Sequence, residues 1–162
     1  MNTFKIMRLL LPALALCATL QTAVAQTQTV CSLTGLSSGW VVIDQQQCLC
    51  CGATGAIRRT QYTIRNIGSM ATGSTVQVCS LTNLPAGWVV IDLTNCLCCG
   101  AEGAPRRTKW TIKNINGLPA GTRVQVCSLE NIPAGWATIS QEQCLCCGAE
   151  GSNRTRWTIK KL

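Results

Sequence analysis

Histidine is absent from the 162-residue sequence, and several other residue types are scarce. Without histidine the chain has no Ser–His or Cys–His nucleophilic pair and no histidine-ligated metal site. The sequence has only six acidic residues, and none of them recurs at the same place in all of the internal repeats described below, so no acid–base pair of carboxylates is indicated. We therefore expect a protein that is not an enzyme and that needs no cofactor.

Long apolar runs are also scarce, and the one clear example, residues 9–20, lies near the N-terminus. Lys5 and Arg8 precede this run, and Ala23, Val24 and Ala25 follow it with the small-x-small pattern of a signal peptidase site. The run is too short to span a bilayer. Residues 1–25 are thus predicted to be a bacterial-type signal peptide, and the mature chain to be exported to the periplasm, the cell surface or the medium, with no membrane span.

Cysteine, by contrast, is abundant: the chain has 13 cysteines, of which all but Cys17 follow the predicted signal peptide. They recur with a period of 48 residues in the pattern C-x16-C-x-C-C-G. Cysteines this dense in a short exported chain indicate a disulfide framework formed in an oxidising compartment. The predicted disulfide cysteines are Cys31, Cys48, Cys50, Cys51, Cys79, Cys96, Cys98, Cys99, Cys127, Cys144, Cys146 and Cys147.

The residues between the cysteines repeat as well, which divides the mature chain into three repeats at residues 26–75, 76–123 and 124–162. In the second repeat, β-branched residues and period-two alternation predict strands at residues 76–81, 88–92 and 108–115. Short turns with proline and glycine separate these segments and favour antiparallel meanders. The predicted fold class is all-β, with about three short antiparallel strands in each disulfide-stapled repeat.

Three arrangements of the repeats remain open from the sequence. Each repeat can be a separate module held by its own disulfides, the three can share a core around a pseudo-threefold axis as in a trefoil or prism, or they can form an open stack. About 45 residues seldom form a sufficient core unaided. One large aromatic in each third strand (Tyr62, Trp110 and Trp157) is predicted to point inward, which favours repeats packed as one domain.

The sequence does not decide which cysteines pair. Adjacent cysteines seldom bond to each other, so we expect Cys79 to bond to one of Cys96, Cys98 and Cys99. The other two can pair locally or with a neighbouring repeat. A thiolate site for copper or zinc, with four cysteines per repeat, is the alternative.

Two sets of residues are candidates for ligand binding. One tryptophan begins each second strand, either as a core residue or as a platform for sugar rings in a multivalent, lectin-like protein: Trp40, Trp88 and Trp136. Basic residues follow the polar face of the third strands or precede it, either as a solvated face or as a stripe that binds an acidic glycan or another polyanion. These are Arg58, Arg59, Arg65, Arg106, Arg107, Lys109, Lys113, Arg154, Arg156 and Lys160.

Both ends of the mature chain are predicted to be strands, at residues 26–30 and at the C-terminus. Such strands could pair with the edge strand of another molecule, and copies could join head to tail into a filament. Inter-chain disulfides are a further possible link between copies. The sequence thus favours a non-catalytic structural protein of the cell surface or extracellular matrix. The alternatives are a trivalent lectin-like or polyanion-binding module and a periplasmic thiolate metal-binding protein.

Overall fold

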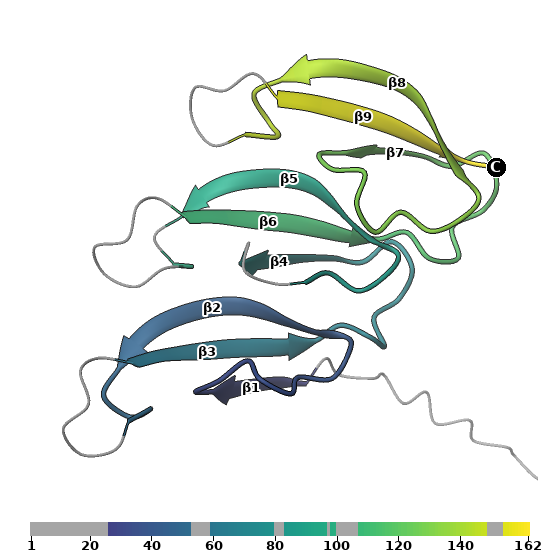
Figure 1. The fold of residues 1–162 in the computed structure, drawn as a ribbon. Coiled ribbons are helices and arrows are strands. Elements are labelled where there is room, and N and C mark those ends of the chain that lie inside the picture. The colour runs from purple at the N-terminus through teal and green to yellow at the C-terminus, as the bar shows by residue number, and fades with distance from the viewer. Residues whose placement is uncertain (1–25, 53–58, 80–82, 97, 100–106, 149–153) are drawn as a thin grey trace, which may run out of the picture.

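The computed structural model describes residues 26–52, 59–79, 83–96, 98–99, 107–148 and 154–162, and the predicted signal peptide lies outside them. The described residues form no helix and nine strands, arranged as three antiparallel sheets of three strands (Figure 1). The all-β prediction and the prediction of three similar repeats are confirmed. The strands are β1 (Thr27–Val30), β2 (Trp40–Cys48), β3 (Arg59–Asn66), β4 (Thr75–Cys79), β5 (Trp88–Cys96), β6 (Arg107–Asn114), β7 (Arg123–Val126), β8 (Trp136–Cys144) and β9 (Arg154–Lys161).

The strand order differs from the predicted meander. In each sheet the third strand lies in the middle, with order β1-β3-β2, β4-β6-β5 and β7-β9-β8. The two outer strands pair antiparallel to the central one, so they run parallel to each other. The predicted meander was wrong because the connection between the first and second strands is too long for a tight hairpin. In the first repeat this connection comprises residues 31–39, which is enough to cross from one side of the central strand to the other.

Each second strand is longer than predicted and carries a β-bulge at the same place. The register shifts between Val42 and Asp44 in β2, and equivalent shifts occur in β5 and β8. The bulged residue is an isoleucine in all three repeats: Ile43, Ile91 and Ile139. A bulge bends the strand and increases its twist, and these strands curve over their sheets in Figure 1.

The three sheets are arranged one after another as an open stack (Figure 1). Strand β2 contacts β4 of the next repeat and β5 contacts β7, whereas no strand of the first repeat contacts a strand of the third within the described residues. Of the three arrangements left open by the sequence, the structure therefore has the open stack, and the repeats do not close around a threefold axis.

Neighbouring repeats share hydrophobic clusters. The first cluster joins Val41 and Ile67 of the first repeat to Val76, Val78 and Ile112 of the second, all of them buried. The second cluster joins Val89 and Ile115 to Val124, Val126 and Ile159. The predicted inward-pointing aromatics, Tyr62, Trp110 and Trp157, each pack partly buried against one of the clusters. Because no single repeat supplies a complete cluster of its own, each one depends on its neighbour for apolar burial.

A buried asparagine fixes the link between the first two repeats. Asn114, 7% exposed, donates from Nδ2 to the carbonyl of Met70 at 3.0 Å, and its Oδ1 accepts from the backbone N–H of Asn116 at 3.0 Å. A buried amide is costly unless its hydrogen bonds are made. The link before β4 is therefore tied to the end of β6, which positions the second sheet relative to the first.

Candidate functional site: cysteine knuckles, basic face and stack ends

The twelve cysteines of the mature chain form six disulfides, two in every repeat. The first cysteine of a repeat bonds to the last, 20 residues later, and the two between them bond to each other across one residue. No bond joins two repeats, and none of these cysteines is left for the inter-chain disulfides that the sequence had left open. The long-range bonds are Cys31–Cys51, Cys79–Cys99 and Cys127–Cys147, and the local ones are Cys48–Cys50, Cys96–Cys98 and Cys144–Cys146.

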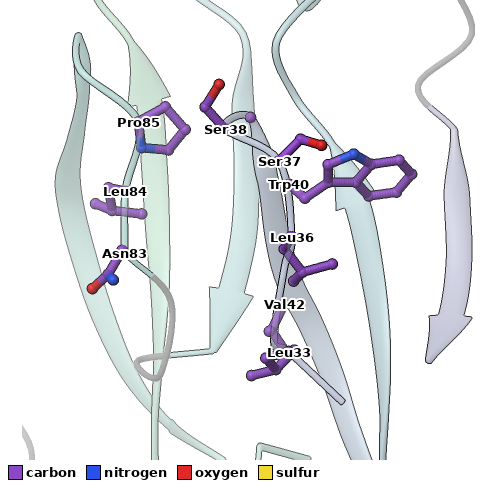
Figure 2. Close-up of a pocket in the computed structure, with 10 residues that line it drawn as sticks. Leu33, Leu36, Ser37, Ser38, Trp40, Val42, Asn83, Leu84 and Pro85 are labelled. Atoms are coloured by element: carbon purple, nitrogen blue, oxygen red, sulfur yellow. The ribbon is translucent and has the colours of Figure 1, made fainter. Parts of the chain in front are cut away.

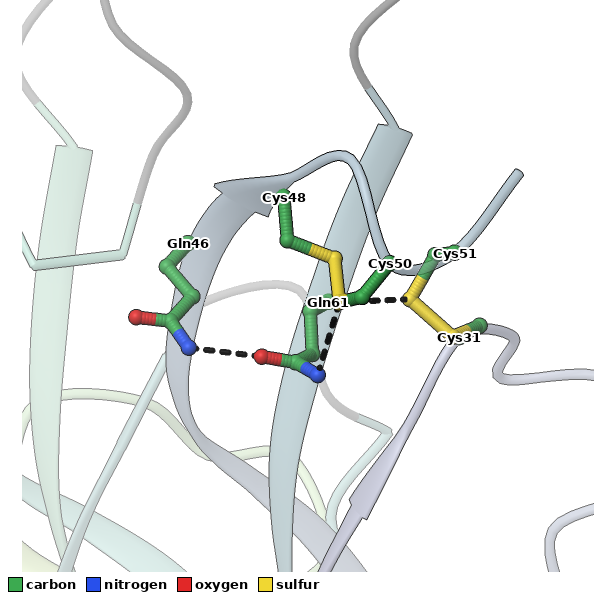
Figure 3. The surroundings of a disulfide bond; sticks show 6 residues. All are labelled: Cys31, Gln46, Cys48, Cys50, Cys51 and Gln61. Atoms are coloured by element: carbon green, nitrogen blue, oxygen red, sulfur yellow. Dashed lines mark hydrogen bonds between the residues drawn. A yellow bond between two sulfur atoms is a disulfide. The ribbon is translucent and has the colours of Figure 1, made fainter. Parts of the chain in front are cut away.

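The two disulfides of a repeat lie against each other in a knuckle, defined here by its C-x-C-C segment and the first cysteine (Figure 3). In the first repeat, Cys50 Sγ is 3.9 Å from Cys51 Sγ, and Gln61 Nε2 donates to Cys50 Sγ at 3.2 Å. Gln46 in turn donates to Gln61 Oε1 at 2.6 Å. Sequence reasoning did not single out these two glutamines, because only their pairing across β2 and β3 brings them to the knuckle.

The sulfur atoms of each C-x-C-C segment lie within 4.8 Å of one another, which is close enough for a shared metal ion. Metals bind the thiolate form of cysteine, and each of these sulfurs is held in a disulfide. The oxidised knuckle therefore offers no thiolate ligand. Metal binding would require prior reduction of both bonds of a repeat.

The knuckle of the second repeat is more buried than that of the first. Cys79 and Cys99 are both fully buried and pack against Val42 and Ile64 of the preceding repeat. Cys31, at the same position in the first repeat, is exposed. The difference follows from the stack, because no repeat precedes the first one among the described residues.

The three candidate tryptophans differ in exposure. Trp88 is 3% exposed and belongs to the core, so it offers no ring face to a sugar. Trp40 is half-buried and lines a groove of about 360 Å³ between the first two repeats, opposite Leu84 and Pro85 (Figure 2). Trp136 is also half-buried, and Lys161 Nζ lies 5.9 Å from its ring centroid. One equivalent lectin-like platform in each repeat is therefore not present.

The candidate basic residues occupy the central strand of each sheet. Arg65, Lys113 and Lys160 hold equivalent positions, as do Lys109 and Arg156, and period-two alternation places each set on the face opposite the inward aromatics. Arg154 begins β9 and is exposed. Arg59 and Arg107 begin β3 and β6, while Arg58 and Arg106 lie outside the described residues.

Two features modify this basic face. Arg156 Nε donates to Glu142 Oε1 at 2.7 Å, so its charge is partly neutralised. Lys113 and Arg123 line a groove of about 550 Å³ between the second and third repeats, together with Thr158. Arg123 was not predicted, because it lies on β7 rather than on a third strand, and only the stacking brings it to Lys113.

The two ends of the stack expose strands whose counterparts are covered. In β8 most residues are exposed, whereas β5 buries Trp88, Val89 and Val90. In β1 Gln28 is exposed, while Val76 and Val124 at the same position are 6% exposed. The sequence predicted strands at both ends, but not which edge of each strand would lack a neighbour.

No protein-family model matches the chain, and neither the curated proteins nor the solved structures include a significant match. The described residues also include no helix with the length and apolarity needed to cross a membrane.

Proposed function

We propose that the protein is an exported, non-catalytic structural protein of the cell surface or extracellular matrix. The observation that carries this proposal is the use of all twelve cysteines of the three repeats in disulfides within an open stack. Disulfides persist in oxidising compartments and replace the large core that repeats of this size lack.

The arrangement of the repeats supports the same role. Stacked repeats form an elongated body whose stability comes from each unit and its interfaces with its neighbours. Such a body can extend without a change in fold. A non-catalytic role of the protein is consistent with the absence of histidine from the sequence and with the wide separation of its six carboxylate residues along the chain.

The proposal is tested by producing the full chain in a bacterium that forms disulfides outside its cytoplasm. We expect the protein to be recovered outside the cytoplasm, with Gln26 as its first residue. Its mass under non-reducing conditions should be lower than that of the reduced chain by two hydrogen atoms for each of six disulfides. Protease treatment of intact cells of the natural host should then remove it from the surface fraction.

The matched control is a chain with Ala23→Arg and Ala25→Arg, which lacks the small residues of the cleavage site. It should retain residues 1–25 and stay associated with the cell. A wild-type chain that remains in the cytoplasm with free thiols would contradict the proposed location and, with it, the structural role at the surface.

A polyanion-binding module is the second candidate, and the groove between Lys113 and Arg123 is the observation that favours it. Two cations from neighbouring sheets, Lys113 on β6 and Arg123 on β7, lie beside this one groove. Without Lys5 and Arg8 of the signal peptide, the mature chain keeps 12 basic and 6 acidic residues, and this net charge of +6 adds a general attraction to acidic glycans or other polyanions.

A further inference from the structure

The contacts between repeats provide a template for a contact between molecules. Between the second and third repeats, the backbone N–H of Cys127 donates to the carbonyl of Val90 at 2.7 Å, and that of Leu93 donates to the carbonyl of Cys146 at 3.3 Å. The N–H of Gly87 donates to the carbonyl of Asn131 at 3.0 Å. The second strand of one repeat is therefore joined to the first strand, crossing loop and knuckle of the next.

The hydrogen bond to the knuckle recurs between the first and second repeats. Gln45 occupies the position of Leu93, and its backbone N–H donates to the carbonyl of Cys98 at 3.2 Å. Cys98 is the counterpart of Cys146. Because the contact depends on backbone groups, it is preserved although Gln45 and Leu93 have unlike side chains.

At the C-terminal end of the stack, β8 presents this same edge without a neighbour. It is the outer strand of its sheet, and among the described strands it contacts β9 alone. Gly135, Thr138 and Gln141 hold the positions of Gly87, Val90 and Leu93, and all three are exposed. An uncovered edge of this kind is a template for pairing with another chain.

An apolar side chain on β8 lacks the packing that its counterparts have. The bulged Ile43 and Ile91 each pack against a cluster shared by two repeats. Ile139, at the same bulge, is 46% exposed. The bulged isoleucine, which packs between repeats at both internal interfaces, is thus uncovered at the end of the stack.

At the opposite end, the first repeat presents the complementary groups. Cys31, Gly35 and Cys50 hold the positions of Cys127, Asn131 and Cys146, and all three are exposed. Strand β1 contacts β3 alone among the described strands. The two ends of one molecule therefore carry the two halves of the internal interface.

We propose that a second copy of this chain binds head to tail, with its first repeat stacked on β8. By the internal template, the Cys31 N–H of the second copy donates to the Thr138 carbonyl. The N–H groups of Gln141 and Gly135 donate to the carbonyls of the second copy's Cys50 and Gly35. The proposal rests on the structural role given above and names its partner. Because the interface does not close on itself, repeated addition gives a filament that continues the stack.

The contact between copies is weaker than the contact between repeats. Ala137 and Thr138 replace the valine pairs of β2 and β5, and Gln28 replaces a buried valine of β4 and β7. Less apolar area is therefore buried, and no covalent link holds the two parts together. Assembly should accordingly depend on protein concentration and reverse on dilution.

The test uses sedimentation velocity of the oxidised mature protein across a wide range of concentrations. The wild type should form dimers and longer species as concentration rises. Ile139→Lys, which puts a charge at the β8 edge, should weaken association at least about tenfold. Leu145→Lys is the control, since Leu145 is 75% exposed and its counterpart Leu49 stays 80% exposed although a repeat is stacked on it. It should assemble as the wild type does.

A mixing experiment tests the direction of assembly. Gln28→Lys blocks the first repeat and leaves β8 open, while Ile139→Lys leaves the first repeat open. At the lowest concentration at which the wild type is fully assembled, each variant alone should be monomeric, and an equal mixture should form a heterodimer and nothing longer. Dimers of Gln28→Lys alone would show symmetric β8–β8 pairing and overturn the proposal, as would a strictly monomeric wild type. These outcomes concern the purified protein, so they are independent of whether export and oxidation proceed as proposed.

Discussion

The backbone N–H of Cys127 donates to the carbonyl of Val90 at 2.7 Å, although the two residues belong to different repeats. Cys127 is also bonded to Cys147, so its disulfide anchors the first strand of the third repeat against the bulged strand of the second. The cysteines therefore have two structural effects. They close each repeat, and they hold the edge that the preceding repeat contacts.

The long-range disulfide of the second repeat is expected to contribute more stability than the local one. Loop-closure entropy predicts about 3 kcal/mol for a bond that closes a loop of 20 residues and about 1 kcal/mol for one that closes a loop of two. Cys79→Ala with Cys99→Ala should lower the free energy of unfolding by the larger amount, as measured by guanidinium denaturation. Cys96→Ala with Cys98→Ala, in the same repeat, is the matched control. Equal losses would show that loop length does not govern these bonds.

Limited reduction is expected to open the knuckles in a fixed order. Cys50 is exposed and lies in a short loop, whereas Cys79 and Cys99 are fully buried. Thiol–disulfide exchange requires access of the attacking thiolate to a sulfur atom. Brief treatment with low dithiothreitol, followed by alkylation and peptide mapping, should label Cys48 and Cys50 before Cys79 and Cys99. The reverse order of labelling would contradict the burial seen in the fold.

Two glycines at equivalent positions are expected to differ in their tolerance of alanine. Gly87 and Gly135 have φ values of +81° and +84°, so both substitutions incur the left-handed backbone cost of about 1–2 kcal/mol. A Cβ at Gly87 would also lie 2.2 Å from Cγ of Asn116, whose amide donates to the carbonyl of Ala86. At Gly135 it would meet the mobile end of Lys161 alone, within 4 Å.

Gly87→Ala should therefore lower the free energy of unfolding by about 2–4 kcal/mol and Gly135→Ala by about half as much. Thermal and guanidinium unfolding of the two variants measure the difference. Asn116→Ala in the Gly87→Ala background removes the clash and should recover part of the loss. Failure of that rescue would mean that the contact with Asn116 is not the cause.

The repeats, strands and disulfide use were predictable from the sequence because they depend on local patterns. The 48-residue period and the alternation in residues 108–115 were sufficient to place β6 within one residue at each end. Strand order was not predictable in the same way. Whether the chain crosses a central strand depends on how the loop at residues 31–39 packs, and residues such as Leu33 and Leu36 pack against a cluster that includes cysteines of the next repeat.

The candidate site was harder to predict because it arises between repeats. The sequence treats Trp40, Trp88 and Trp136 as equivalent, yet their exposure depends on which neighbour covers each one. Likewise, Arg123 reaches the groove beside Lys113 only because the third sheet is stacked on the second. Repetition in the sequence predicts equivalent units, whereas the ends of a stack make those units unequal.

The second candidate function predicts a position-dependent effect of charge on polyanion binding. Lys113→Gln removes a cation from the groove shared with Arg123, while Lys161→Gln removes the same charge from a side chain that lies over Trp136. If the groove holds an acidic glycan, Lys113→Gln should elute from a heparin column at clearly lower salt than Lys161→Gln. Equal shifts would indicate a nonspecific effect of net charge. At about 0.15 M salt, exposed charges are screened over about 8 Å, so only several cations acting together can hold a polyanion. A wild-type protein that the column does not retain at this salt concentration would exclude the groove as a polyanion site.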